Sequence, residues 1–176
     1  NRDSHYPYRF DSYFHYLTGF VEPEAVLVLV ASGSSPRSIL FCREKNLERE
    51  IWDGFRHGPE GAKEMFGFDE AHPIAQLDEM LPKLLADQPS LYFHLGADSD
   101  WDARAVGWLN SVREQVRSGI TAPGAIQDVR ALLDEMRLVK DAHELALMRH
   151  AAQISARAHV RAMQHCAQAL RAGQEV

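Results

Sequence analysis

The sequence predicts an α/β or α+β fold in which helices flank a mixed β-sheet and a long helix follows. Three observations support this fold class. An unbroken aliphatic run at residues 25–31 is typical of a strand covered on both faces. A second apolar run at 38–44 follows a loop rich in Gly, Ser and Pro, so residues 24–43 are expected to form a hairpin. Amphipathic helical patterns then alternate with one further strand.

The first half of the chain mixes strand patterns with helix breakers. Residues 11–19 alternate weakly and close on a Thr-Gly pair, which favours a first strand. The run at 25–31 is the expected central strand. Between residues 48 and 68, four glycines and one proline break any helix into pieces of one or two turns.

Two helices and a strand are expected next. Residues 74–88 have apolar positions spaced three and four apart, with Pro82 expected in the first turn or at a kink. An aromatic strand follows at 91–96. Residues 98–119 fit a helix with an Asp or Ser cap and a Gly stop. We interpret the acidic stretch at 98–102 as that cap, because it matches no calcium-binding loop.

A domain boundary is expected in the segment "TAPGAIQDV", giving a first domain at 1–124 and a second at 125–176. Beyond a short helical pattern at 129–138, "DAHE" at 141–144 is a capping box that opens a helix to about Leu170.

The long helix carries apolar stripes on two opposite sides, which predicts two packing partners. One stripe contains Leu145, Met148, Val160, Met163 and Leu170, and the other contains Leu147, Ala151, Ile154 and Ala158. The sheet could cover one stripe, and no other element of these 176 residues is left to cover the second. We therefore expect an exposed apolar surface that favours association, and a chain that is a piece of a longer protein.

Composition excludes several classes of protein. With 176 residues, 45% hydrophobic and 25% charged, the chain is expected to fold rather than remain disordered. Its net charge of -6, with scattered basic residues, argues against nucleic-acid binding. No apolar run approaches the roughly 18 residues that span a bilayer, so no membrane association is expected. Cys42 and Cys166 match no disulfide or metal motif and are interpreted as reduced, buried thiols of a cytoplasmic protein.

The residues alone indicate no complete active site. His143 and His150 are seven positions apart, whereas a helical zinc pair needs a spacing of four. The stretch "GSS" at 33–35 has neither the glycine spacing nor the lysine of a phosphate-binding loop, and there is no Gly-x-Ser-x-Gly motif. We expect no catalytic residue and no metal ligand in this chain.

Three blocks of the sequence resemble bacterial Xaa-Pro aminopeptidases, also called aminopeptidase P. They are "RDSHYPYRFDSYFHYLTGFVEPEAVLVLV", "EIWDGFRHG" and "DEMRLVKDAHELALMRHAAQISARAHVRAM". The resemblance implies the ribonuclease-H-like N-terminal domain of the creatinase and aminopeptidase P families, without its first helix and strand. It also implies that the opening helix of a pita-bread catalytic domain follows.

The resemblance further implies a parent enzyme that removes the N-terminal residue preceding a proline. Its substrates would be peptides with proline at the second position. It would use two metal ions, usually manganese, held by two Asp, one His and two Glu that lie beyond Val176. Without those ligands no activated water forms at neutral pH. The 176-residue chain is therefore expected to be inactive and to hold no cofactor.

For this part of the parent, the resemblance implies a role in assembly and at the rim of the substrate cleft. The rim positions it matches are Asp3, Trp52 and Arg137. A carboxylate and a guanidinium can pair across an interface, and an indole offers an apolar wall for a proline ring. The simpler interpretations are a turn residue, a core anchor and a helix-end cation, respectively.

Two alternatives remain open. The chain could be a stand-alone, non-catalytic binding module, or the N-terminal domain of a related prolidase or creatinase. "YPYR" followed by "YLTGFVEPEAVL" favours aminopeptidase P. The expected assembly is a homo-oligomer, a tetramer for the parent, with a dimer possible for the isolated chain through the helix at 141–170.

Overall fold

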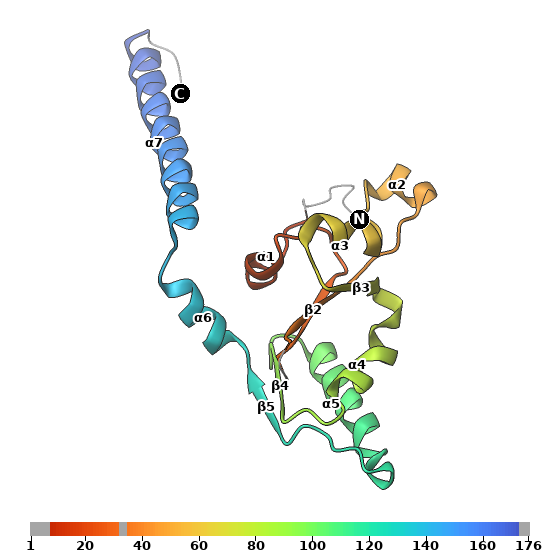
Figure 1. The fold of residues 1–176 in the computed structure, drawn as a ribbon. Helices are drawn as coiled ribbons and strands as arrows, with labels where there is room; N and C mark the ends of the chain where they lie inside the picture. The colour runs from red at the N-terminus through yellow and green to blue at the C-terminus, as the bar shows by residue number, and fades with distance from the viewer. Residues whose placement is uncertain (1–7, 32–34, 173–176) are drawn as a thin grey trace. The chain divides into compact units, whose positions relative to one another are not determined.

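The structure, a computed structural model, describes residues 8–31 and 35–172 (Figure 1). By its internal contacts the chain divides into two compact units, residues 1–130 and residues 131–176. The helices of the first unit are α1 (Ser12–Thr18), α2 (Leu47–Asp53), α3 (Gly58–Phe66), α4 (Leu77–Leu85) and α5 (Ser99–Arg113), with 3-10 turns at Ile74–Gln76 and Val116–Ser118. Helix α6 (Arg130–Leu138) crosses into the second unit, which contains α7 (Ala142–Arg171).

The first unit contains a mixed sheet of β1 (Val26–Val30), β2 (Arg37–Cys42) and β3 (Glu70–Pro73), in that order. β1 and β2 are antiparallel, which confirms the expected hairpin, whereas β2 and β3 are parallel. A second pair, β4 (Ser90–Phe93) and β5 (Ala125–Asp128), is also parallel. With the helices around them and the long helix α7 at the end, these sheets confirm the predicted fold class.

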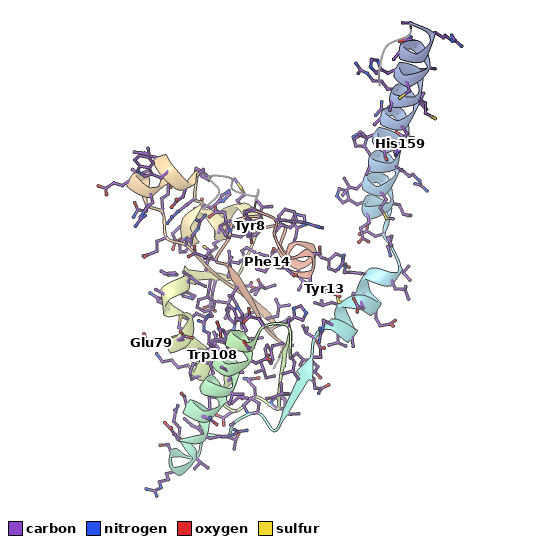
Figure 2. All side chains as sticks on the ribbon, turned by 180° about the vertical axis from the view of Figure 1, so that it is seen from behind. Tyr8, Tyr13, Phe14, Glu79, Trp108 and His159 are labelled. Atoms are coloured by element: carbon purple, nitrogen blue, oxygen red, sulfur yellow. The ribbon has the colours of Figure 1, made fainter. Side chains whose placement is uncertain are left out.

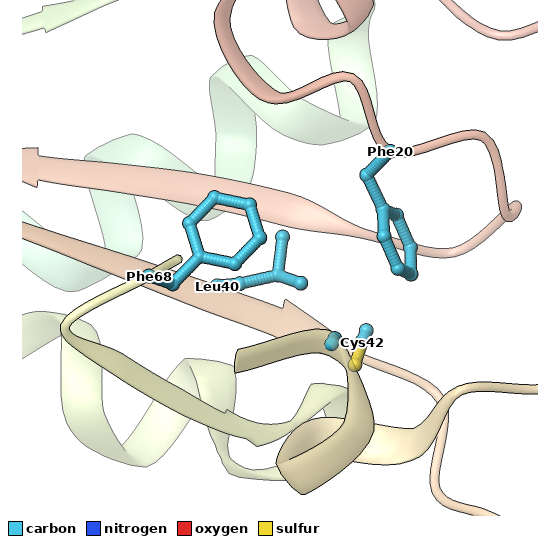
Figure 3. Close-up of a cluster of buried hydrophobic side chains, with 5 residues drawn as sticks. Phe20, Leu40, Cys42 and Phe68 are labelled. Atoms are coloured by element: carbon cyan, nitrogen blue, oxygen red, sulfur yellow. The ribbon is translucent and has the colours of Figure 1, made fainter. Parts of the chain in front are cut away.

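Strand β2 lies in the middle of the three-stranded sheet and is buried on both faces. Ile39 and Phe41 pack with Leu77 and Leu81 of α4 on one face. Leu40 and Cys42 pack on the other face with side chains that include Phe20, Ala62 and Phe68 (Figure 3). The expectation that residues 25–31 form the central strand is wrong for the described sheet. Both faces of β1 contact core clusters, which explains its continuous aliphatic sequence, but it lies beside β2.

The predicted strand at 11–19 is instead the helix α1. Asp11 caps its start by accepting hydrogen bonds from the backbone N–H groups of Tyr13 (2.9 Å) and Phe14 (2.8 Å). Gly19 ends it in the left-handed region, at φ 64°. Capping at both ends outweighs the strand preference of the aromatic side chains. Phe14 packs against the core beside Phe20, and it is labelled with Tyr13 in Figure 2.

Helices α4 and α5 pack together and cover one face of the sheet. Asp98 caps α5 through hydrogen bonds from the N–H groups of Asp100 and Trp101, so the interpretation of the acidic stretch as a cap is confirmed. Trp108 of α5 (Figure 2) donates from Nε1 to Asp78 of α4 at 2.9 Å. Pro82 lies inside α4 rather than in its first turn.

Two four-residue strands escape sequence analysis because neither contains a run of strand-forming apolar residues. β3 reads "EAHP" and contains no apolar run, and it forms by pairing with β2. β5 reads "AIQD" within the expected boundary segment and pairs with β4, so residues 125–128 lie in the first unit. In both cases the strand depends on a partner distant in sequence.

In the second unit, α7 begins with the expected capping box. The Asp141 carboxylate accepts from the Glu144 N–H, and the Glu144 carboxylate accepts from the Asp141 N–H, each at 2.8 Å. Apolar residues of both predicted stripes are exposed, among them Leu147, Met148, Ile154 and Met163. Within the part of the chain that the structure describes, no helix is long and apolar enough to cross a membrane.

We expect Leu40→Ala to lower the free energy of unfolding by about 2 to 5 kcal/mol, because it leaves a cavity where a fully buried side chain stood. Leu29→Ala, in the neighbouring strand at a side chain 57% exposed, is the matched control and should cost about 0.5 kcal/mol or less. Urea titration followed by circular dichroism measures both. Equal losses would contradict this account of the core.

Candidate functional site

The segment between β2 and α3 forms a projection that we call the α2 arm, residues 43–58. Asn46 caps α2 by accepting a hydrogen bond from the Arg49 N–H at 3.0 Å, and Gly54 ends the helix at φ 84°. Over Leu47–Asp53 the helix has no buried residue. Figure 1 shows α2 projecting from the rest of the first unit. The arm therefore presents side chains to the surroundings instead of contributing to the core.

Trp52 is the most exposed large apolar side chain of the described residues, at 84%. Its alternative interpretation as a core anchor is therefore wrong. Leu47, Ile51 and Phe55 of the same arm are also strongly exposed. Four exposed apolar residues within nine positions make the α2 arm a candidate binding surface. Trp52 thus stands on a projecting helix where a partner or ligand can contact it.

A buried carboxylate holds the base of the α2 arm. Glu22, only 8% exposed, accepts a hydrogen bond from the His57 N–H at 2.7 Å. The same oxygen lies 2.6 Å from His57 Nδ1, which carries the hydrogen because a carboxylate only accepts. The other oxygen of Glu22 forms an ion pair with Arg43 Nη2 at 3.4 Å. One side chain thus contacts both the first residues and the last residues of the arm.

Lys45 adds a second connection across the base. Its Nζ donates to the Arg56 carbonyl at 3.0 Å, pairs with Glu50 at 3.2 Å, and lies 4.2 Å from the centre of the Phe55 ring. The backbone at Gly58 also lies close to the backbone at Lys45. A Cβ atom added to Gly58 would lie 3.1 Å from the Lys45 backbone nitrogen. Gly58 also has φ 69°, so glycine is required there on two grounds. The two ends of the arm are held in direct contact.

Aromatic rings surround the His57 imidazole. The rings of Phe20, Phe55 and Phe66 lie 5.8, 4.9 and 5.4 Å from it, measured between centroids. These rings shield the contact between His57 and Glu22 from water, which strengthens it. Sequence analysis did not identify this network. Glu22 belongs to an apparent turn, and no sequence pattern links it to a histidine 35 positions later.

The other two predicted site residues lie elsewhere. Arg137 is in the last turn of α6 and is half-buried, which also fits its interpretation as a helix-end cation. Asp3 lies outside the described residues. Trp52 and Arg137 belong to different units, so a shared cleft rim stays a prediction.

Several carboxylates of the first unit have lowered pKa values because neighbouring residues of the fold donate hydrogen bonds to them. Hydrogen bonds from Ser38 hold the pKa of Asp69 below its usual range. Partial burial alone would raise the pKa of Asp78, but hydrogen bonds from Arg104 and Trp108 lower it overall. Hydrogen bonds from Arg130 lower the pKa of Asp128. Across residues 8–31 and 35–172, no group of three or more His, Cys, Asp or Glu is placed to hold a metal ion. The described residues therefore do not fit a metal centre.

Comparison with known proteins adds a family and its structures. The model of a family described as "Aminopeptidase P, N-terminal domain" matches residues 1–92. An Xaa-Pro aminopeptidase of Escherichia coli is 41% identical over 165 residues, 93% of this chain and 37% of the relative. The structure of Pseudomonas aeruginosa aminopeptidase PepP superposes with a TM-score of 0.87 at 46% identity, over 93% of this chain and 37% of that one. An Escherichia coli aminopeptidase P in complex with substrate gives the same TM-score at 41% identity and the same coverages. The chain thus spans little more than a third of the length of these relatives.

Cys42 is expected to resist alkylation in the folded chain. Burial, with a contribution from Glu22, raises the pKa of its thiol from 9.0 to about 11. At pH 8 only on the order of one molecule in a thousand then carries the reactive thiolate. Iodoacetamide at pH 8 should modify half-buried Cys166 first, and Cys42 only as the pH approaches 11 or after unfolding in urea. Mass spectrometry of the labelled peptides measures this, and equal labelling of both thiols in the folded chain would contradict it.

Proposed function

Because the chain belongs to the aminopeptidase P N-terminal domain family, we propose that it is the non-catalytic N-terminal part of a metal-dependent Xaa-Pro aminopeptidase. The parent enzyme would remove the N-terminal residue that precedes a proline. The similarity over nearly the whole chain to Xaa-Pro aminopeptidases supports this activity for the parent. In our proposal this part contributes a wall of the substrate cleft and a surface for assembly, while other parts of the parent perform the chemistry.

The single observation in this chain that carries the proposal is the exposure of Trp52 on the α2 arm. An indole that is 84% exposed can lie against a proline ring or an adjacent apolar side chain of a peptide. In the proposed role Trp52 forms an apolar wall at the cleft rim. Asp3 and Arg137 complete the proposed rim, where their opposite charges can pair across an interface.

The metal ions would be held outside this chain. A dinuclear centre needs several carboxylate or imidazole ligands around one point, and the described residues bring no such group together. We propose that two manganese ions bind in the remaining part of the parent. When bound they would lower the pKa of a bridging water. This chain's own contribution is to contact and orient the peptide.

We further propose that residues 1–124 form the N-terminal domain, and that 125–176 form the linker, whose first residues pair with β4 as the strand β5, and the opening helix of the catalytic domain. The exposed stripes of α7 support a role in assembly, as a tetramer in the parent and a dimer of the isolated chain. Two free thiols, one of them buried, support a reducing, cytoplasmic location.

The isolated chain should be inactive on peptides with proline at the second position, whereas the full-length parent should cleave them when manganese is supplied. Release of the first residue, followed by mass spectrometry, is the measurement. Cleavage of a longer Xaa-Pro peptide separates an aminopeptidase from a prolidase, which would accept dipeptides only.

The isolated chain, prepared free of other proteases, tests both its expected inactivity and the proposed assembly. Hydrolysis of the peptides by such a preparation would overturn the proposal that the catalytic residues lie outside this chain. Sedimentation showing only monomer at high concentration would count against association through α7.

Trp52→Ala in the full-length parent should lower kcat/KM about tenfold, which corresponds to the loss of about 1.4 kcal/mol of contact with the substrate. Trp52→Phe should retain most of the activity because it keeps an aromatic wall. Met65→Ala is the matched control, since Met65 of α3 is exposed to a similar degree. Equal kcat/KM for Trp52→Ala and the unaltered parent would remove Trp52 from the cleft rim.

A further inference from the structure

We infer that Glu22 is a positioning residue whose carboxylate clasps the base of the α2 arm and thereby fixes where Trp52 stands. The inference deepens the proposed function and rests on it for the role of Trp52. The clasp itself follows from contacts within the first unit.

The α2 arm needs such a clasp because its helix contributes nothing to the core. α2 has no buried residue over Leu47–Asp53, so core packing does not determine its position, and its own ion pairs, Glu50 with Lys45 and Asp53 with Arg56, also run to the base. The position of α2 is therefore set at the base of the arm, where residues 43–45 leave the sheet and residues 56–58 lead into α3. A rigid base is therefore a condition for a defined location of Trp52.

Glu22 divides its two carboxylate oxygens between the two sides of this base. Oε2 contacts Arg43 directly after β2, and Oε1 contacts the backbone and ring of His57 directly before α3. Release of this carboxylate would remove one contact at each end, while the hydrogen bond from Lys45 to the Arg56 carbonyl would remain. The contact between Lys45 and Gly58 would remain, so the arm would loosen rather than unfold.

Glu22 is itself anchored to the core. Phe20, two residues earlier, is fully buried in the cluster that contains Leu40 and Cys42 (Figure 3). The side chains of Glu22, Arg43 and His57 are 8%, 11% and 16% exposed. Charged hydrogen bonds at such depth are stronger than surface pairs, and loss of one partner leaves the others without compensation. The clasp therefore connects the arm to this buried core cluster.

The test uses the full-length parent with the variants Glu22→Gln and Glu22→Ala, alone and combined with Trp52→Ala. Gln keeps the size of the side chain and one oxygen for His57 but loses the ion pair with Arg43, so it remains informative if the Ala variant fails to fold. Glu79→Gln is the matched control, because the Glu79 carboxylate pairs with Lys83 on the exposed face of α4 (Figure 2).

Hydrogen exchange measures how firmly the α2 arm is held, independently of enzyme activity. Amides at 44–56 should exchange at least about threefold faster in Glu22→Gln, and faster again in Glu22→Ala, while β2 amides change less than about twofold. Glu79→Gln should change neither region. Unaltered exchange at 44–56 in both Glu22 variants would overturn the inference.

Kinetics then test whether Glu22 acts through Trp52. Glu22→Gln should lower kcat/KM at least about threefold in the unaltered parent, but less than about twofold in the Trp52→Ala background, since the two residues act in series. Equal losses in both backgrounds would overturn the inference. Faster exchange at 44–56 without any effect of Trp52→Ala on kcat/KM would support the clasp and overturn the proposed role of Trp52. The two failures are thus distinguishable.

Discussion

The two-sided burial of β2 is the constraint on which the rest of the first unit depends. Its side chains alternate between two hydrophobic clusters, so each face requires its own cover of helices. The cover on one side is formed by α4 and α5. On the other side it is formed by α3 and the segment around Phe20. The β2 strand thereby determines where the chain before β1 and the chain after α3 must lie.

That constraint also creates the site. Phe20 is held against β2, and Glu22 follows two residues later beside the point where β2 ends. α3 is held on the same side through Ala62, and His57 immediately precedes α3. The carboxylate and the imidazole are therefore brought within 2.6 Å by elements that pack for hydrophobic reasons. A polar network at the base of the α2 arm is a consequence of the core.

Sequence analysis identified those features that depend on local chemistry. The hairpin, the Asp98 cap, the capping box at Asp141 and the short helices of the glycine-rich segment are all specified by neighbouring residues. It failed at residues 11–19, where aromatic content suggested a strand but Asp11 and Gly19 cap a helix. It also failed where a strand exists only through a distant partner, as with β3 and β5. The exposure of Trp52 and the contacts of Glu22 with Arg43 and His57 depend on tertiary packing, which no residue pattern along the chain encodes.

The exposed residues of α2 and the residues that stabilise the core are different residues, because α2 is attached only through the base of the arm. A core residue such as Leu40 cannot be exchanged without loss of folding free energy, because it fills space beneath the sheet. Residues on α2 fill no such space, so their exchange costs little as long as the base of the arm is intact. The exposed surface of α2 can consequently be redesigned, by evolution or in the laboratory, with little effect on the stability of the domain.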